Sequence, residues 1–153
     1  MRYIINFLEN RRFRVILNGL QSDEQRQENG VPQGSVISVT LFLIAINSVF
    51  QNIPKEVRIL LYADDIIIFV SAKTRKRIRT LLQKTLNSLE KWTLRTGFQI
   101  SREKSAVLHV CHKRSHKIVP ALKIQNREIS EIDSMRILGV VFDRRLNWNT
   151  HFD

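Results

Sequence analysis

Two adjacent carboxylates, Asp64 and Asp65, lie between two apolar runs, residues 59–62 and 66–70. The runs contain β-branched, aliphatic and aromatic residues, so the pattern predicts an antiparallel hairpin with both acids at its turn. Two carboxylates held this close repel one another unless a cation lies beside them. Oxygen ligands on a rigid hairpin suit Mg²⁺, which completes its shell with water and substrate phosphates. The pair therefore predicts a divalent metal site and phosphoryl-transfer chemistry.

An ordinary hairpin also explains the four residues Tyr62-Ala63-Asp64-Asp65, because aspartate favours turns even where it has no chemical role. Short motifs have many chance matches. A catalytic interpretation of this turn therefore depends on a second motif elsewhere in the chain.

The second motif has the sequence Gly-Val-Pro-Gln-Gly-Ser and begins at Gly30. Gly30 and Gly34 have no side chain, so the backbone there can approach a ligand closely, while Pro32 stiffens the loop between them. Gln33 would then project a donor and an acceptor into a cleft. The alternative is a loop that simply begins a helix, with Ser35 as the N-cap.

With both motifs in this order, the chain resembles the reverse transcriptases of non-LTR, LINE-like retrotransposons, especially the jockey-like elements of arthropods. The resemblance covers nearly the full chain. It implies RNA-directed DNA synthesis with Mg²⁺ or Mn²⁺, and it implies an RNA template, a DNA primer and deoxynucleoside triphosphates as partners. In this family two metal ions activate the primer 3′-hydroxyl and steady the triphosphate. By resemblance, Asp64 is the main catalytic metal ligand and Asp65 the supporting one.

The resemblance also implies a surface for the nucleotide and the template. The glycine loop would lie against the templating base pair and the incoming nucleotide, with Gln33 as the contacting side chain. The residues assigned to this surface are Gly30, Pro32, Gln33, Gly34, Ser35, Tyr62 and Ala63.

Two further roles follow from the resemblance alone. Lys104 would approach the triphosphate and protonate the leaving pyrophosphate as a general acid, and a plain surface lysine is the alternative. A hairpin near Leu138 and Gly139 would act as the primer grip that supports the 3′ end of the primer. The alternative there is a buried strand with a closely packed glycine.

Apolar spacing and turn signals predict the elements that position these residues. A tight hairpin turn is expected at Asn18-Gly19, and a long helix should begin at Thr74 as N-cap and end at Gly97. The helix over residues 36–50 has almost no polar face, so we expect it to be buried beneath the sheet. The other expected elements are a helix over 3–10, strands over 13–17, 21–27 and 106–111, and a small hairpin around Asn126.

These elements predict an α+β fold, with an antiparallel polymerase palm-type sheet packed on helices. We expect a single partial reverse transcriptase domain over residues 1–153. Residues 1–110 would be the palm core, and residues 111–153 would be the end of the palm, the primer-grip-like hairpin and the start of the thumb. The fingers and most of the thumb are expected to be absent. The family's further essential aspartate, at the end of an earlier strand, has no counterpart here, so we expect little or no polymerase activity from this chain alone.

The composition favours a polyanionic partner. The chain has 25 Lys and Arg against 14 Asp and Glu, which gives a formal net charge of +11 and a pI near 10.5; such a charge points to nucleic acid. The basic residues are spread along the chain, which disfavours a membrane surface. The single cysteine, Cys111, excludes an internal disulfide framework. With no signal sequence or membrane span, the chain is expected to be intracellular, in the nucleus or cytoplasm, and not secreted.

Three alternatives accompany this interpretation. The first is a catalytically inactive nucleic-acid-binding remnant, and the second is another palm polymerase, viral or telomerase-like, which fits the two motifs less well. The third is a zinc site, with His109, Cys111, His112 and His116 as candidate ligands. Strand geometry disfavours it, because residues 109 and 111 would share one face of the strand while residue 112 points to the other.

The long helix has a basic face that is either solvated or in contact with nucleic acid. Its residues are Lys73, Arg75, Lys76, Arg77, Arg79 and Lys84.

Overall fold

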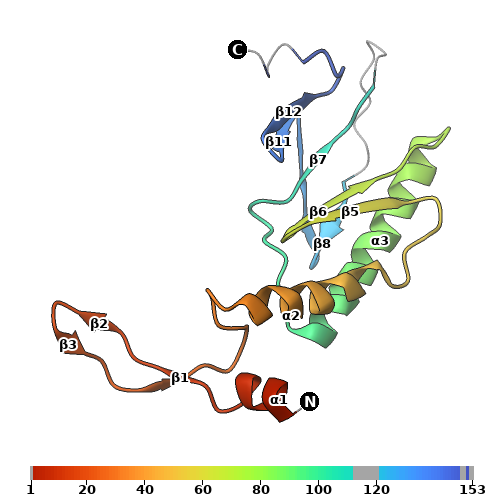
Figure 1. Ribbon diagram of the computed structural model, residues 1–153. Coiled ribbons are helices and arrows are strands. Elements are labelled where there is room, and N and C mark those ends of the chain that lie inside the picture. The colour runs from red at the N-terminus through yellow and green to blue at the C-terminus, as the bar shows by residue number, and fades with distance from the viewer. Residues whose placement is uncertain (1, 112–120, 149–150, 152–153) are drawn as a thin grey trace. The chain divides into compact units, whose positions relative to one another are not determined.

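The computed structural model describes residues 2–111, 121–148 and 151. The chain divides into two compact units, Met1–Ser48 and Val49–Asp153, and Figure 1 shows the order of the helices and strands. Both units contain helices and two-stranded ladders, which confirms the α+β class. No helix in the described part of the chain is long and apolar enough to cross a membrane.

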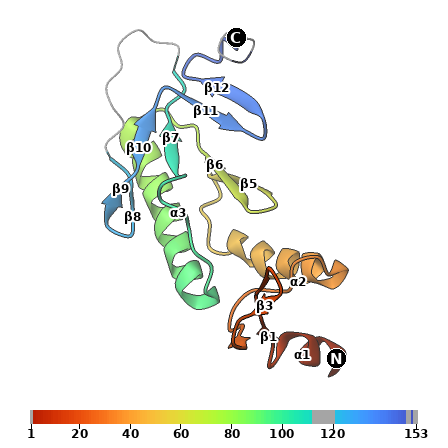
Figure 2. The same ribbon diagram turned by 90° about the vertical axis from the view of Figure 1, so that its left-hand side faces the viewer.

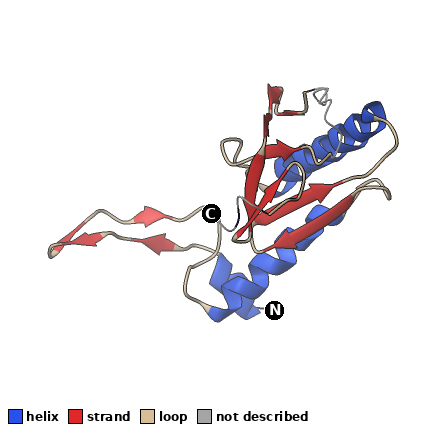
Figure 3. Cartoon of the chain, turned by 90° about the horizontal axis from the view of Figure 1, so that it is seen from above, coloured by secondary structure: helices blue, strands red, loops and turns tan. Residues whose placement is uncertain are grey.

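The first unit begins with α1 (Arg2–Leu8) and a long hairpin that bends back at Asn18-Gly19. Both turn residues have positive φ, 49° and 79°, as a two-residue hairpin turn requires. The hairpin consists of two ladders, seen end to end in Figure 3. In the inner ladder β2 (Ile16–Leu17) pairs with β3 (Leu20–Gln21), and in the outer one β1 (Arg12–Phe13) pairs with β4 (Gln25–Arg26). The predicted hairpin is confirmed.

Helix α2 (Val36–Asn47) and the 3₁₀ turn η1 (Ser48–Phe50) follow. The predicted helix is confirmed, whereas its burial beneath the sheet stays a prediction, because α2 and the strands around the two acids lie in different units. Val36 is 88% exposed and Ile44 is 68% exposed, whereas Ile46 is buried.

Helix α3 (Arg75–Thr96) provides the core of the second unit. Its buried side chains recur at helical spacing along one stripe, and they include Leu81, Leu86, Leu89 and Trp92. Both predicted ends are confirmed. The Thr74 hydroxyl accepts a hydrogen bond from the Arg77 N–H at 3.3 Å, and Gly97 ends the helix in the left-handed region at φ 79°.

The strands of the second unit form four separate two-stranded ladders. Three are antiparallel hairpins: β5 (Arg58–Tyr62) with β6 (Asp65–Phe69), β8 (Lys123–Ile124) with β9 (Arg127–Glu128), and β11 (Ser134–Ile137) with β12 (Val140–Asp143). The fourth ladder joins β7 (Ala106–Leu108) to β10 (Ser130–Ile132) in parallel, as Figure 2 shows. The described strands thus form separate ladders, one of them parallel, and the predicted palm-type antiparallel sheet stays a prediction. Parallel pairing needs a long connection, and residues 109–129 provide it.

Polar side chains of α3 hold the β8–β9 hairpin in place. The Gln83 side-chain amide donates to the Lys123 carbonyl and accepts from the Lys123 N–H, both at 2.9 Å. The Glu90 carboxylate accepts a hydrogen bond from the N–H of Gln125, at the hairpin's turn. Ile124 is 4% exposed. The hairpin is thus fixed to α3 by hydrogen bonds from α3 side chains to its backbone and by burial of Ile124.

The segment after β12 depends on the carboxylate of Asp143. This carboxylate accepts hydrogen bonds from the backbone N–H groups of Arg145 at 2.7 Å, Asn147 at 2.9 Å and Trp148 at 3.2 Å. The Arg145 bond is the main reason that the pKa of Asp143 lies below its usual value, because these donors favour the ionised form.

We predict that Gly97→Ala lowers the free energy of unfolding by about 1 kcal/mol, because alanine is strained at positive φ. No atom lies within 4 Å of the added Cβ, so steric conflict adds nothing to this cost. Gly97→Asn should cost less, since asparagine visits the left-handed region more readily. Urea unfolding measures both variants, and equal costs would contradict the backbone explanation.

We also predict that Asp143→Asn destabilises the protein at neutral pH and that this difference shrinks in acid. Because the pKa of Asp143 is lowered in the folded state, its stabilising effect is present above the unfolded-state pKa, about 3.9, and is lost as pH falls through the lower folded value. Urea unfolding at pH 7 and at about pH 2.5 measures this. The control is Asp23→Asn, which removes an exposed carboxylate that makes no side-chain hydrogen bond with the described residues. A pH-independent difference would contradict the prediction.

Candidate metal-binding hairpin

The predicted hairpin around the two acids is present. Five residue pairs join β5 to β6, from Arg58 opposite Phe69 to Tyr62 opposite Asp65. The loop between the strands therefore consists of Ala63 and Asp64 only. Asp64 lies in the turn itself, and Asp65 is the first residue of β6.

The turn needs an uncommon backbone conformation at Ala63. Its φ is 49°, in the left-handed region where a residue with a Cβ is strained by roughly 1 kcal/mol. Two-residue hairpin loops require positive φ, so the five-pair ladder holds Ala63 in this state. Such strain often accompanies functional turns, where the rest of the structure sets the geometry.

Both carboxylates are exposed to solvent. Neither makes a hydrogen bond or an ion pair with any residue that the structure describes, so their oxygens are open to an external ligand. Among residues 2–111, 121–148 and 151, no group of three or more His, Cys, Asp or Glu side chains could hold a metal ion. The hairpin thus offers at most two carboxylates. This donor set fits Mg²⁺, which commonly binds through one or two carboxylates plus water and phosphate oxygens.

The glycine loop lies in the first unit, whereas the acidic hairpin lies in the second. Gly30 and Gly34 both have positive φ, 80° and 87°, which explains why glycine is needed at these positions. The Gly30 carbonyl accepts a hydrogen bond from the Arg11 guanidinium at 2.6 Å. Ser35 takes the N-cap position of α2 with extended backbone, but its side chain makes no capping hydrogen bond. Ser35 is therefore an N-cap by position alone.

Lys104 lies in the turn that precedes β7, with its side chain exposed. The turn is closed by the Ser105 N–H, which donates to the Arg102 carbonyl at 3.1 Å. The Ser105 hydroxyl also donates to the Ser101 carbonyl at 2.6 Å. The backbone that carries Lys104 is thus well defined.

Leu138 and Gly139 form the two-residue turn between β11 and β12. Both have positive φ, 49° and 86°, as the favoured tight hairpin turn requires. Leu138 is 52% exposed, and nothing lies within 4 Å of a Cβ built on Gly139. The alternative of a buried strand with a closely packed glycine is therefore wrong, and the predicted hairpin is confirmed.

The zinc alternative finds no support in the described part of the chain. His109 and Cys111 both lie beyond the end of β7 at Leu108, and they join no group of metal ligands among the described residues. His112 and His116 lie outside the described residues.

Comparison with known proteins shows which family the chain belongs to. A family model described as "Reverse transcriptase (RNA-dependent DNA polymerase)" matches residues 1–142. The chain belongs to the reverse transcriptase family. With the relatives below, the match identifies a segment of a non-LTR retrotransposon reverse transcriptase, as the sequence motifs predict.

Among its relatives is the "RNA-directed DNA polymerase from mobile element jockey" of Drosophila funebris, 30% identical over 154 residues and covering 97% of this chain. The protein of the same name from Drosophila melanogaster is 28% identical over 152 residues and covers 95% of this chain. The "Probable RNA-directed DNA polymerase from transposon X-element" of Drosophila melanogaster is 26% identical and also covers 95%. The chain spans only 16–17% of the length of these curated relatives.

We predict that Ala63→Gly leaves the free energy of unfolding nearly unchanged. Glycine relieves the positive-φ strain of about 1 kcal/mol, which offsets its larger unfolded-state entropy of similar size. The control is Ala106→Gly, because Ala106 lies in ordinary extended backbone in β7, where glycine costs about 0.5–1 kcal/mol. Urea unfolding compares the two variants, and equal destabilisation would mean that Ala63 is unstrained.

Proposed function

We propose that this chain supplies part of the polymerase site of a retrotransposon reverse transcriptase, with Asp64 and Asp65 as ligands for Mg²⁺ or Mn²⁺. The observation that carries the proposal is the two-residue turn that presents both carboxylates, exposed and without a partner among the described residues, at the end of a five-pair ladder. Membership of the family supports it.

The carboxylates act by binding cations. Two ionised acids this close in sequence at one turn repel each other, and a divalent cation beside them removes the repulsion. When bound, such an ion polarises phosphate oxygens and lowers the barrier to nucleotidyl transfer. The residues of the turn contribute orientation, because Ala63 and the ladder hold the backbone that carries the two acids.

Other residues complete the proposal. Gln33, in the glycine loop, contacts the templating base pair and the incoming nucleotide, and Lys104 protonates the leaving pyrophosphate. The exposed Leu138 side chain and the Gly139 backbone support the primer. The partners are an RNA template, a DNA primer and deoxynucleoside triphosphates, as the names of the polymerase relatives suggest. The arrangement belongs to a palm-type polymerase fold.

A second candidate function is nucleic-acid binding without catalysis. It is favoured by the formal net charge of +11 and by the lack of a third acid beside the hairpin among the described residues. Under this alternative the Asp64-Asp65 turn has no affinity for metal ions, while basic side chains still bind phosphates.

Manganese binding separates the two candidates. We predict that Mn²⁺ selectively broadens the NMR amide signals of residues 62–66, because a bound paramagnetic ion relaxes nearby nuclei. The double variant Asp64→Asn, Asp65→Asn should lose this broadening, since neutral amides bind the ion far less strongly than carboxylates. Asp23→Asn, which removes one exposed carboxylate elsewhere, should keep it. Broadening that is absent, or that persists in the double variant, would favour the non-catalytic alternative.

A further inference from the structure

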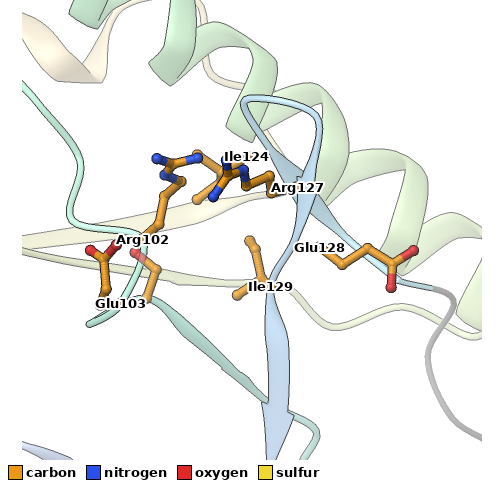
Figure 4. Close-up of a pocket in the computed structure, with 7 residues that line it drawn as sticks. Arg102, Glu103, Ile124, Arg127, Glu128 and Ile129 are labelled. Carbon is orange, nitrogen blue, oxygen red and sulfur yellow. The ribbon is translucent and has the colours of Figure 1, made fainter.

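A cavity of about 200 Å³ lies in the second unit, between the turn before β7 and the β8–β9 hairpin. Figure 4 shows its lining side chains, two arginines among them. The residues that matter for its chemistry are Arg102, Glu103, Ile124, Arg127, Glu128 and Ile129.

The parallel ladder explains why the two arginines meet. In a parallel ladder the strands start at the same edge, and Ala106 pairs with Ser130 at the start of β7 and β10. Arg102 and Arg127 each lie a few residues before these positions. The register therefore brings both arginines to one edge, and in Figure 4 their guanidinium groups reach the same part of the cavity.

Neither arginine has a counterion at contact distance within the described chain. Arg102 is half-buried and Arg127 is exposed, and neither guanidinium group makes a hydrogen bond or an ion pair with another described residue. By contrast, the half-buried Arg144 pairs with the Glu131 carboxylate at 2.8 Å. A charged group that loses water is normally paired, so the half-buried Arg102 guanidinium has donors left for an anion, and the exposed Arg127 guanidinium beside it adds more.

The charge of the cavity suits a single monoanion. The Glu103 side chain accepts a hydrogen bond from the Ser101 hydroxyl at 3.4 Å. Its own backbone N–H, and then this hydroxyl, lower its pKa, and the charges of Arg102 and Arg127 lower it further. Glu103 is therefore ionised at neutral pH and offsets one of the two arginines. The Glu128 carboxylate points away from the guanidinium groups in Figure 4, which leaves an excess of one positive charge facing the cavity.

Both walls of the cavity are held in place. The β8–β9 hairpin is fixed to α3 by the hydrogen bonds of Gln83 and Glu90. The turn that carries Arg102 is closed by two hydrogen bonds of Ser105. Because the supporting backbone is set before a ligand arrives, less conformational entropy is lost on binding.

We propose that this cavity binds one backbone phosphodiester of a nucleic-acid strand. The Arg102 and Arg127 guanidinium groups donate hydrogen bonds to its phosphate oxygens, and the aliphatic surface of Ile129 contacts the attached sugar. A phosphodiester carries one negative charge and continues into a chain on both sides, which fits an open cavity with one excess positive charge on a protein of net charge +11. The site lies outside the Asp64-Asp65 turn and needs no metal; it rests on the proposed function only in taking the strand to be nucleic acid.

Fluorescence anisotropy with a labelled single-stranded RNA, in EDTA and over a range of salt concentrations, tests the site. The double variant Arg102→Gln, Arg127→Gln should bind roughly tenfold more weakly, as expected for the loss of hydrogen bonds to a charged group. The slope of the logarithm of the binding constant against the logarithm of the salt concentration should become shallower by about 0.7, the value for one phosphate of a single strand. The matched control Arg58→Gln, Arg136→Gln removes the same charge from exposed arginines of the same unit and should have a clearly smaller effect.

A third variant distinguishes loss of the phosphate site from misfolding. Glu103→Gln should strengthen RNA binding, because it removes the carboxylate that competes with the phosphate. A misfolded variant would instead bind RNA more weakly. Equal losses in the double variant and its control, or a wild-type chain that does not bind RNA, would overturn the proposal. So would a double variant that loses affinity for a free deoxynucleoside triphosphate but not for RNA. Since the measurement is made in EDTA, its outcome is independent of the Mn²⁺ test of the acidic hairpin.

Discussion

The buried stripe of α3 is the constraint on which the second unit depends. Leu81, Leu86, Leu89 and Trp92 supply much of its apolar core, and the hairpin at Lys123 is fixed to the same helix. Burial of this stripe provides the main favourable free energy, whereas the strands form only two-stranded ladders, which are marginal by themselves. The helix therefore stabilises the short β8–β9 hairpin, which would be marginal alone.

Tight turns carry several of the residues to which we assign a function. At Ala63-Asp64 a strained backbone presents two acids, and at Leu138-Gly139 a similar turn exposes an apolar side chain. In each case the ladder beneath the turn orients the residues that lie at its tip, as rigid scaffolds do for functional loops. The overall excess of positive charge complements the acids, because a polyanionic strand is attracted to the protein as a whole while the two carboxylates attract only cations.

Local signals in the sequence predict local structure well. The Asn18-Gly19 turn, the Thr74 cap and the Gly97 end of α3 each follow from one or two residues, and each is present. Burial of α2 and the pairing of β7 with β10 could not be predicted in the same way. Whether an apolar helix is covered depends on which elements pack against it, and a parallel ladder depends on residues far apart in sequence, which leave no periodic signal. The acidic turn was predictable because its residue types and its strand pattern are contiguous; the cavity between Arg102 and Arg127 was not, because it depends on that long-range pairing.

The β7–β10 ladder has a consequence for how the molecule folds. Each antiparallel ladder in the described chain closes around a hairpin, whereas this one must first close the connection over residues 109–129, and long-range closure of this kind slows folding. Because closing this connection costs more chain entropy than closing a tight turn, we expect the ladder to open more readily than the antiparallel hairpins. A strand of nucleic acid that bridges Arg102 and Arg127 would bind only the closed form and would stabilise it by mass action. Slowed amide hydrogen exchange in β7 and β10 would then report occupancy of the cavity.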